Sequence, residues 1–182
     1  MKGVVVGWLS TVMRMITYII ISIVGLLILL AGVVGIYGSM LPATHTASVS
    51  VVVNAPRERV WELVNAAEQF PEWLEDITKV EILPEQDGKR VFRQHMGRNS
   101  FVLRETISEA PSRVVRTIVD DNGPFTGTWD HVFEDVGNGQ TKLTVTEEGT
   151  IKSAIPRAIM KLSCGYDYYL KRMAVAMKAK LG

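Results

Sequence analysis

The sequence has a single cysteine, Cys164, and no acidic residue before Glu58. One cysteine cannot form a disulfide within the chain, so cysteine usage does not indicate a redox compartment. The sequence also lacks the motifs G-x-G-x-x-G, H-E-x-x-H and G-x-S-x-G and the P-loop. Its three histidines are far apart, and no spacing of histidine, cysteine or carboxylate residues is typical of a metal site. We therefore expect no metal and no cofactor, and no standard motif identifies an enzyme.

Charged residues are unevenly distributed along the chain. Residues 57–150 hold 18 acidic and 11 basic side chains, whereas residues 151–182 hold seven basic side chains and one acid, Asp167. A nucleic-acid-binding surface needs a clear basic excess, so the acidic body of the chain argues against a nucleic-acid partner. The basic C-terminal segment is typical of the solvated face of an amphipathic helix, which we favour over contact with anionic lipid.

An uncharged run of 23 residues lies near the N-terminus, from Met15 to Tyr37. As a helix it would rise about 35 Å, enough to cross the hydrocarbon core of a bilayer with some tilt. A cleaved signal peptide has a shorter apolar region followed by a small-residue cleavage site, which the sequence after Tyr37 matches only loosely. We therefore expect residues 1–40 to be an uncleaved, single-pass transmembrane anchor in contact with the lipid bilayer.

The charges that flank this anchor predict its orientation. Lys2 and Arg14 lie on its N-terminal side, and no lysine or arginine follows it until Arg57. The positive-inside rule then places the N-terminus in the cytoplasm and the rest of the chain on the extracytoplasmic side. Ala31 and Gly35 form a small-xxx-small pair, through which two anchors could approach closely as a weak homodimer.

After a predicted linker over residues 41–47, residues 48–182 form a predicted α+β domain. The β-branched run SVSVVV at its start indicates a strand. Two short helices are expected next, the first opened by Asn54 and Pro56 and the second around Glu68 to Ile77. Six further strand-like runs separated by turn residues predict an antiparallel meander. The turns fall at residues 87–88, 97–99, 110–112, 121–124 and 137–139.

The last predicted element is one long helix from about Ile155 to Leu181. Apolar side chains recur along it at spacings of three or four and form one continuous stripe. The members of this stripe are Ile155, Ile159, Leu162, Tyr166, Tyr169, Met173 and Met177. A seven-stranded antiparallel sheet must bury one face, and this helix is the obvious cover for it. A sheet curved around the helix would leave a cavity between the two.

The order of these elements resembles the START-like (SRPBCC) helix-grip superfamily, and more narrowly its polyketide cyclase/dehydrase and lipid-transport group. The resemblance covers roughly residues 46–182 and excludes the anchor. Its motifs are Asn54-Ala55-Pro56 with Glu58, Val60 and Trp61; Phe70-Pro71-Glu72-Trp73; Gly127-Thr128-Trp129; and the run GQTKLT from Gly139 to Thr144. The resemblance implies a fold that binds lipids, sterols, polyketides, quinones or hormones, in some members with catalysis and in many without it. Fold alone does not fix which of these applies.

Strand alternation selects candidate site residues. Trp129 and His131 share a face with Phe125 and Phe133, and Glu147 shares a face with Val145 on the next strand. If the aromatic face points inward, His131 and Glu147 could form an acid–base pair, orient a polar group of a ligand, or make an internal hydrogen bond. The sequence leaves these three roles open. The expected ligand-contacting residues are Trp129, His131, Glu147, Leu162, Tyr166, Tyr169 and Met173.

Two further strands carry polar residues whose direction matters. Hydrophobic alternation favours Arg104 outward and Glu105 inward, and an inward Glu105 would need a partner or a raised pKa. In the run from Arg90 to Met96, the alternation does not decide whether the even-numbered or odd-numbered residues face inward.

Three functions are consistent with these features. The leading hypothesis is a membrane-anchored binding module that holds a hydrophobic small molecule, such as a lipid, quinone or polyketide-like compound, between the sheet and the C-terminal helix. The second is a cyclase- or dehydratase-type enzyme that uses His131 and Glu147 as acid–base residues. The third is a scaffold for protein–protein interaction with a collapsed core.

Overall fold

The computed structural model describes residues 2–120, 123 and 125–182, with side chains from Val12 onward. Three residues of the predicted turn at 121–124 therefore lie outside the described part of the chain. The bounds are α1 (Lys2–Met40), β1 (Thr44–Val53), α2 (Arg57–Asn65), the 3-10 turn η1 (Ala67–Gln69), α3 (Phe70–Trp73), β2 (Ile77–Gln86), β3 (Lys89–Met96), β4 (Asn99–Glu109), β5 (Arg113–Ile118), β6 (Phe125–Gly137), β7 (Gln140–Ile151), α4 (Ala154–Ser163) and α5 (Tyr168–Leu181).

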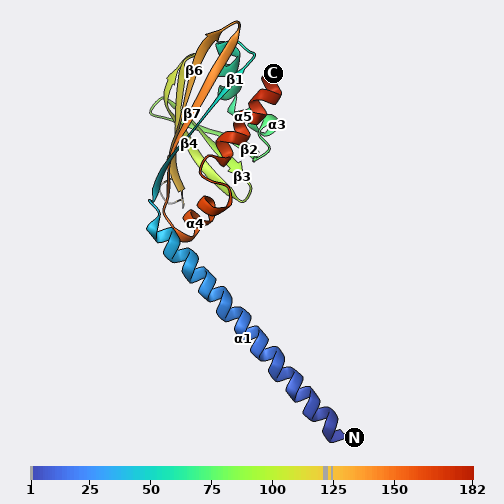
Figure 1. The fold of residues 1–182 in the computed structure, drawn as a ribbon. Helices are drawn as coiled ribbons and strands as arrows, with labels where there is room; N and C mark the ends of the chain where they lie inside the picture. The colour runs from blue at the N-terminus through green and yellow to red at the C-terminus, as the bar shows by residue number, and fades with distance from the viewer. Residues whose placement is uncertain (1, 121–122, 124) are drawn as a thin grey trace.

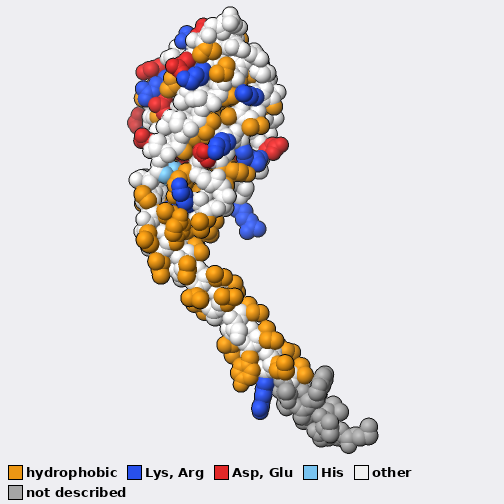
Figure 2. Space-filling view, in the orientation of Figure 1, with side chains coloured by type: hydrophobic (Ala, Val, Ile, Leu, Met, Phe, Trp, Pro, Cys, Tyr) orange, Lys and Arg blue, Asp and Glu red, His pale blue; other side chains and the backbone are white. Residues whose placement is uncertain are grey.

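The first helix, α1, projects away from the rest of the molecule (Figure 1). Its stretch Val12–Met40 is long and apolar enough to cross a membrane. Hydrophobic side chains make up much of its visible surface (Figure 2), and Arg14 is the one charged residue in this stretch. The predicted apolar N-terminal helix is therefore confirmed, and it is compatible with a membrane anchor or a signal sequence.

The seven strands form one antiparallel sheet in the order β1-β7-β6-β5-β4-β3-β2. Strands that are consecutive in sequence from β2 to β7 are neighbours in the sheet. The first strand, β1, lies at the edge beyond β7 and pairs with it along the whole length of β1. The tight β6–β7 hairpin needs left-handed backbone at Gly137, Asn138 and Gly139 (φ +85°, +54° and +70°), which explains the glycines at its tip. The predicted seven-stranded meander is confirmed.

The sheet curves around α5, which lies across its concave face (Figure 1). Leu170 and Met177 of α5 are buried in a core cluster with Val60 of α2, Val114 of β5 and Leu143 of β7. The predicted α+β helix-grip architecture, with a C-terminal helix covering the sheet, is confirmed.

The prediction of one continuous helix from Ile155 to Leu181 is wrong. The chain leaves the helical path after Ser163, and Gly165 adopts a left-handed conformation (φ +79°) while its N–H donates to the Met160 carbonyl (2.9 Å). This is how a glycine commonly ends a helix. The apolar spacing of four between Leu162 and Tyr166 happens to continue across the break, so the stripe concealed it. Helix α4 lies beside α1 at the base of the domain, and of these two C-terminal helices α5 is the one that covers the sheet (Figure 1).

The first strand is longer than predicted. It begins at Thr44 rather than Ser48, because β7 extends far enough to pair His45 with Gly149 and Ala47 with Glu147. Only residues 41–43 therefore separate α1 from β1, whereas the sequence predicted a linker over 41–47.

Candidate ligand-binding site

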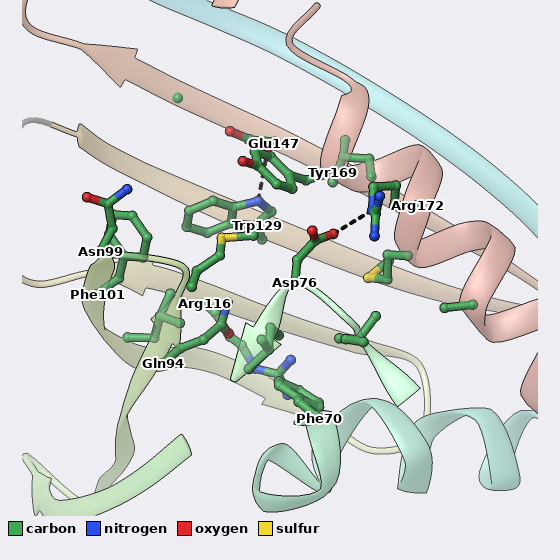
Figure 3. Close-up of a pocket in the computed structure, with 18 of the residues that line it drawn as sticks. Phe70, Asp76, Gln94, Asn99, Phe101, Arg116, Trp129, Glu147, Tyr169 and Arg172 are labelled. Carbon is green, nitrogen blue, oxygen red and sulfur yellow. Dashed lines mark hydrogen bonds and ion pairs between the residues drawn. The ribbon is translucent and has the colours of Figure 1, made fainter. Parts of the chain in front are cut away.

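A cavity of about 800 Å³ lies between the concave face of the sheet and α5. Its wall is mostly apolar, as Figure 3 shows for Phe70 and Phe101. Of the residues left undecided by alternation on β3, Gln94 and Met96 line the cavity, so the even-numbered residues face inward. A volume of this size is typical of pockets that hold drug-sized organic ligands.

A row of polar side chains crosses the concave face of the sheet, and three of its four members line this cavity. Glu105 pairs with Arg116 in the β4–β5 register, Arg116 with Trp129 in β5–β6, and Trp129 with Glu147 in β6–β7. The four residues thus occupy matching positions on four consecutive strands. Residues at matching positions point to the same side of a sheet, so all four reach the concave face.

Arg116 and Glu105 form a buried ion pair in this row. The Arg116 guanidinium is within 3.2 Å of the Glu105 carboxylate through both Nε and Nη2, and each side chain is less than a tenth exposed. Arg116 also donates to the carbonyl of Val64 (2.8 Å) and to the side chain of Asn65 (3.1 Å), which ties α2 to the sheet. Burial lowers the pKa of Arg116, and the Glu105 carboxylate opposes that effect. The inward Glu105 therefore has the partner that its position requires.

His131 lies beside this pair and is buried, as strand alternation predicted. Burial, reinforced by the nearby Arg116 charge, lowers its pKa to about 3, and backbone groups of Val114 and Trp129 act against this shift. The imidazole is therefore neutral near pH 7. Its Nδ1 atom is buried without a hydrogen-bond partner among the described residues. A neutral ring with so low a pKa is a poor general base but can still exchange a hydrogen bond with a ligand.

Glu147 pairs with His45 rather than with His131. Its Oε1 lies 3.4 Å from His45 Nε2, and its Oε2 accepts a hydrogen bond from the Trp129 indole (3.1 Å; Figure 3). The ring of Tyr166 stacks on His45 with centroids 4.1 Å apart. Burial raises the pKa of Glu147, and His45 and the Trp129 indole partly offset the increase. The result is a partly dehydrated carboxyl group at the cavity wall, held between a histidine and an indole.

The opening of the cavity is bordered by a second set of charges. Arg172 of α5 donates to Asp76 (2.7 Å; Figure 3) and to Glu75 (3.0 Å), and both carboxylates lie in the connection between α3 and β2. Arg172 and Asp76 are partly exposed and Glu75 is exposed, and all three line the cavity. The ion pairs therefore hold α5 to the far side of the opening.

Six of the seven sequence-selected residues come together around the cavity: Trp129, His131, Glu147, Tyr166, Tyr169 and Met173. Leu162 does not, because it lies on α4 with 65% of its surface exposed. Sequence reasoning missed His45, which it assigned to the linker, and Arg116. The required partner for Glu105 was the available signal for Arg116. Among the described residues, no group of three or more His, Cys, Asp or Glu residues could hold a metal ion.

Comparisons with known proteins identify the class to which this fold and cavity belong. The family model described as "Polyketide cyclase / dehydrase and lipid transport" matches residues 44–165. A Streptomyces halstedii protein named "Putative polyketide cyclase" is 34% identical over 89 residues, which cover 46% of this chain and 80% of that protein. The chain therefore belongs to the polyketide cyclase/dehydrase and lipid-transport family, as its sequence motifs predicted.

Solved structures confirm the helix-grip fold. The Zhui aromatase/cyclase from Streptomyces sp. R1128 matches with a TM-score of 0.65 and 18% identity over 75% of this chain and 93% of its own. A START superfamily protein from Mycobacterium smegmatis matches with a TM-score of 0.64 and 20% identity over 75% of this chain and 97% of its own. Norcoclaurine synthase from Thalictrum flavum matches with a TM-score of 0.59 and 12% identity over 80% of this chain and 90% of its own. At these identities the likeness shows the fold alone.

Proposed function

We propose that this protein is a membrane-anchored binding module for a hydrophobic small molecule. The observation that carries the proposal is the apolar cavity of about 800 Å³ between the sheet and α5. Its wall offers a large apolar surface together with a few polar groups, which is the usual composition of a site for an organic ligand. A lipid, a quinone or a polyketide-like compound has the matching chemistry.

The polar groups support a ligand that is apolar over most of its length and carries one oxygen-containing group. Glu147, when protonated, and the free Nδ1 of His131 could both exchange hydrogen bonds with a hydroxyl or carbonyl. The methionines at the wall, Met96, Met160 and Met173, adapt to irregular apolar shapes. The apolar α1 would keep the cavity near a bilayer, where such ligands concentrate.

Native mass spectrometry of the full chain released from detergent, combined with lipid extraction, tests this proposal. We expect an apolar adduct at a ratio of one per chain, with a mass that identifies the ligand class. A Leu103→Trp substitution in the cavity wall should reduce that adduct, whereas Val136→Trp at an exposed site should not. Equal adduct levels in the two variants, or none in the parent chain, would overturn the proposal.

A second candidate function is a cyclase- or dehydratase-type enzyme. The observation that favours it is the Glu147 carboxyl, whose pKa is raised inside the cavity next to His45. A carboxyl with a raised pKa holds its proton more tightly than an ordinary carboxylic acid does, which suits a general acid. The very low pKa of His131 moves this role from the sequence-predicted pair of His131 and Glu147 to Glu147 and His45. The test is Glu147→Gln, with the ligand identified by mass spectrometry as the substrate. Loss of its conversion while the bound ligand is retained would support the enzyme hypothesis. Unchanged conversion would exclude Glu147 as the acid–base residue.

The remaining sequence hypotheses lead to proposals of different strength. A collapsed scaffold would not retain a cavity of this volume, so the scaffold hypothesis has the least support. The orientation with the N-terminus in the cytoplasm still rests on the charges that flank α1. A reporter fused after Gly182 tests this orientation. Activity of a reporter that works only in the cytoplasm would show that the C-terminus is cytoplasmic and would overturn the proposed orientation. The weak homodimer through Ala31 and Gly35 also stays a proposal.

A further inference from the structure

The N-terminal end of helix α4 packs directly against the C-terminal end of α1. A Cβ atom on Gly38 of α1 would lie 1.9 Å from the carbonyl oxygen of Ala154, so the two backbones touch where α4 begins. Only glycine allows so close an approach at this point. The contact fixes α4 beside the last turns of the apolar helix.

A buried arginine completes this junction. Arg157 of α4 is 8% exposed and donates hydrogen bonds to the carbonyls of Gly38 (3.1 Å), Leu41 (2.6 Å), Ile151 (3.2 Å) and Lys152 (3.2 Å). Carbonyls at the C-terminal end of a helix have no partners within the helix and carry a partial negative charge. The guanidinium satisfies the carbonyl of Gly38 near the end of α1 and that of Leu41 just after it, and it joins α1, β7 and α4 into one unit.

The outward face of α4 is apolar and exposed. Ile155, Ile159 and Leu162 are 46%, 56% and 65% exposed, and their spacing of four and three places them on one side of the helix. Ile155 Cγ1 would lie 3.9 Å from a Cβ on Gly35, so this face continues the apolar surface of α1. Figure 2 shows hydrophobic side chains running from α1 onto the base of the domain.

Other positions of α4 face the protein interior. Arg157 and Ala158 are buried, and Met160 lines the ligand cavity together with Thr126 and Ile151. Exposed Lys152 and Lys161 bracket the helix at its two ends. An apolar face flanked by lysines is typical of a helix that lies in the headgroup layer of a bilayer.

We infer that α4 is a membrane-docking helix. It lies flat on the bilayer surface where α1 leaves the lipid, with Ile155, Ile159 and Leu162 in the boundary between headgroups and acyl chains. Lipid is the occupant because the face is continuous with α1, so a bilayer that surrounds α1 would also meet α4. Docking holds the Met160 end of the cavity at the membrane surface. The inference rests on the proposed role of α1 as a membrane anchor.

Depth-dependent quenching in the full chain tests this inference. The native cysteine is removed by Cys164→Ser, and an environment-sensitive nitrobenzoxadiazole label is attached through Leu162→Cys. The protein is reconstituted in phosphatidylcholine vesicles with one third phosphatidylglycerol and with nitroxide-labelled lipids. We expect a blue-shifted emission that shallow nitroxides quench more strongly than deep ones.

Two matched labels separate the possible outcomes. Val136 is an exposed apolar residue (47%) at the C-terminal end of β6, whereas Thr126, which lines the cavity with Met160 of α4, is at the N-terminal end of that strand. A label on Val136→Cys should therefore stay unquenched. Leu27→Cys lies within α1, where deep nitroxides should quench most.

An unquenched label at residue 162 with a quenched label at 27 overturns docking and leaves the anchor intact. Unquenched labels at both sites overturn the anchor itself. Quenching between labels of two copies at residue 162, without lipid quenching, would assign the face to a second chain and also overturn docking.

Discussion

A Cβ atom on Gly149 would lie 2.5 Å from Cε1 of His45 and 2.7 Å from its Nε2. The two residues are directly opposite each other on β7 and β1. The same Cβ would lie 3.1 Å from Oε1 of Glu147, so the hydrogen atom in place of a side chain at Gly149 creates the space in which the His45–Glu147 pair forms.

Gly149→Ala should therefore disturb this pair more than the fold. The clashing atoms belong to side chains, which can move, so we expect the free energy of unfolding to fall by about 1–3 kcal/mol. In a His45→Ala background the same substitution should cost less than about 1 kcal/mol, because the main clash is gone. Denaturant unfolding of the four proteins in detergent, followed by tryptophan fluorescence, measures the cycle. Equal costs in both backgrounds would show that His45 does not set the requirement for glycine.

The buried ion pair predicts an asymmetric response to charge removal. Glu105→Gln leaves the Arg116 guanidinium buried without a counter-charge, so we expect a loss of about 3–5 kcal/mol in the free energy of unfolding. The control is Glu134→Gln, which removes the partner of Lys142 from an exposed pair 2.9 Å long and should cost under about 1 kcal/mol. Similar losses in the two variants would contradict the buried character of the Arg116 pair.

His131 predicts a dependence of stability on pH. Its pKa is about 3 in the folded protein against an ordinary value of 6.5, so between these values the unfolded chain binds a proton that the folded chain does not. The contribution is fully present above pH 6.5 and is lost as the pH falls toward 3, by up to about 4 kcal/mol. His131→Leu should flatten the stability profile in this window. Val132→Leu, at the next position of β6 and without a titratable group, serves as the control and should leave the slope unchanged. A slope that survives in His131→Leu would assign the proton uptake to another group.

The charges at the cavity opening predict faster ligand exchange when they are removed. Arg172→Met cuts the links from α5 to Asp76 and Glu75, so the opening should widen more often. We expect the release rate of 11-(dansylamino)undecanoic acid to rise roughly 3-fold, with little change in thermal stability, because partly exposed ion pairs are weak. Lys171→Met removes a neighbouring surface pair with Asp167 and is the matched control. Stopped-flow release into acceptor vesicles measures both rates, and equal rates would show that Arg172 does not restrain the opening.

Local patterns in the sequence were sufficient to predict most of the fold. Strand alternation placed Trp129, His131 and Glu147 on the inner face, and turn residues separated the strands, because both signals depend only on near neighbours. The apolar run predicted α1 for the same reason. Hydrophobic alternation also placed Glu105 inside the sheet, where the structure buries it.

The remaining features depend on residues that are distant in sequence. His45 is part of the site because β7 extends β1 toward the N-terminus, and β-branched composition could not predict that extension. Arg116 is buried because Glu105, Val64 and Asn65 together satisfy its guanidinium. Glu105 lies on β4, and Val64 and Asn65 are the last two residues of α2. The break between α4 and α5 was hidden because the apolar stripe keeps its spacing across Gly165.

The short connection between α1 and the domain has a consequence for how the cavity can be used. A tethered domain usually samples a volume set by the length of its linker. Here only residues 41–43 intervene, and Arg157 ties the end of α1 to α4 and β7. The cavity is therefore kept at one height and one tilt relative to the axis of α1. This rigid arrangement suits a protein that receives its ligand at one membrane. It is unsuited to a carrier that moves a ligand between two membranes.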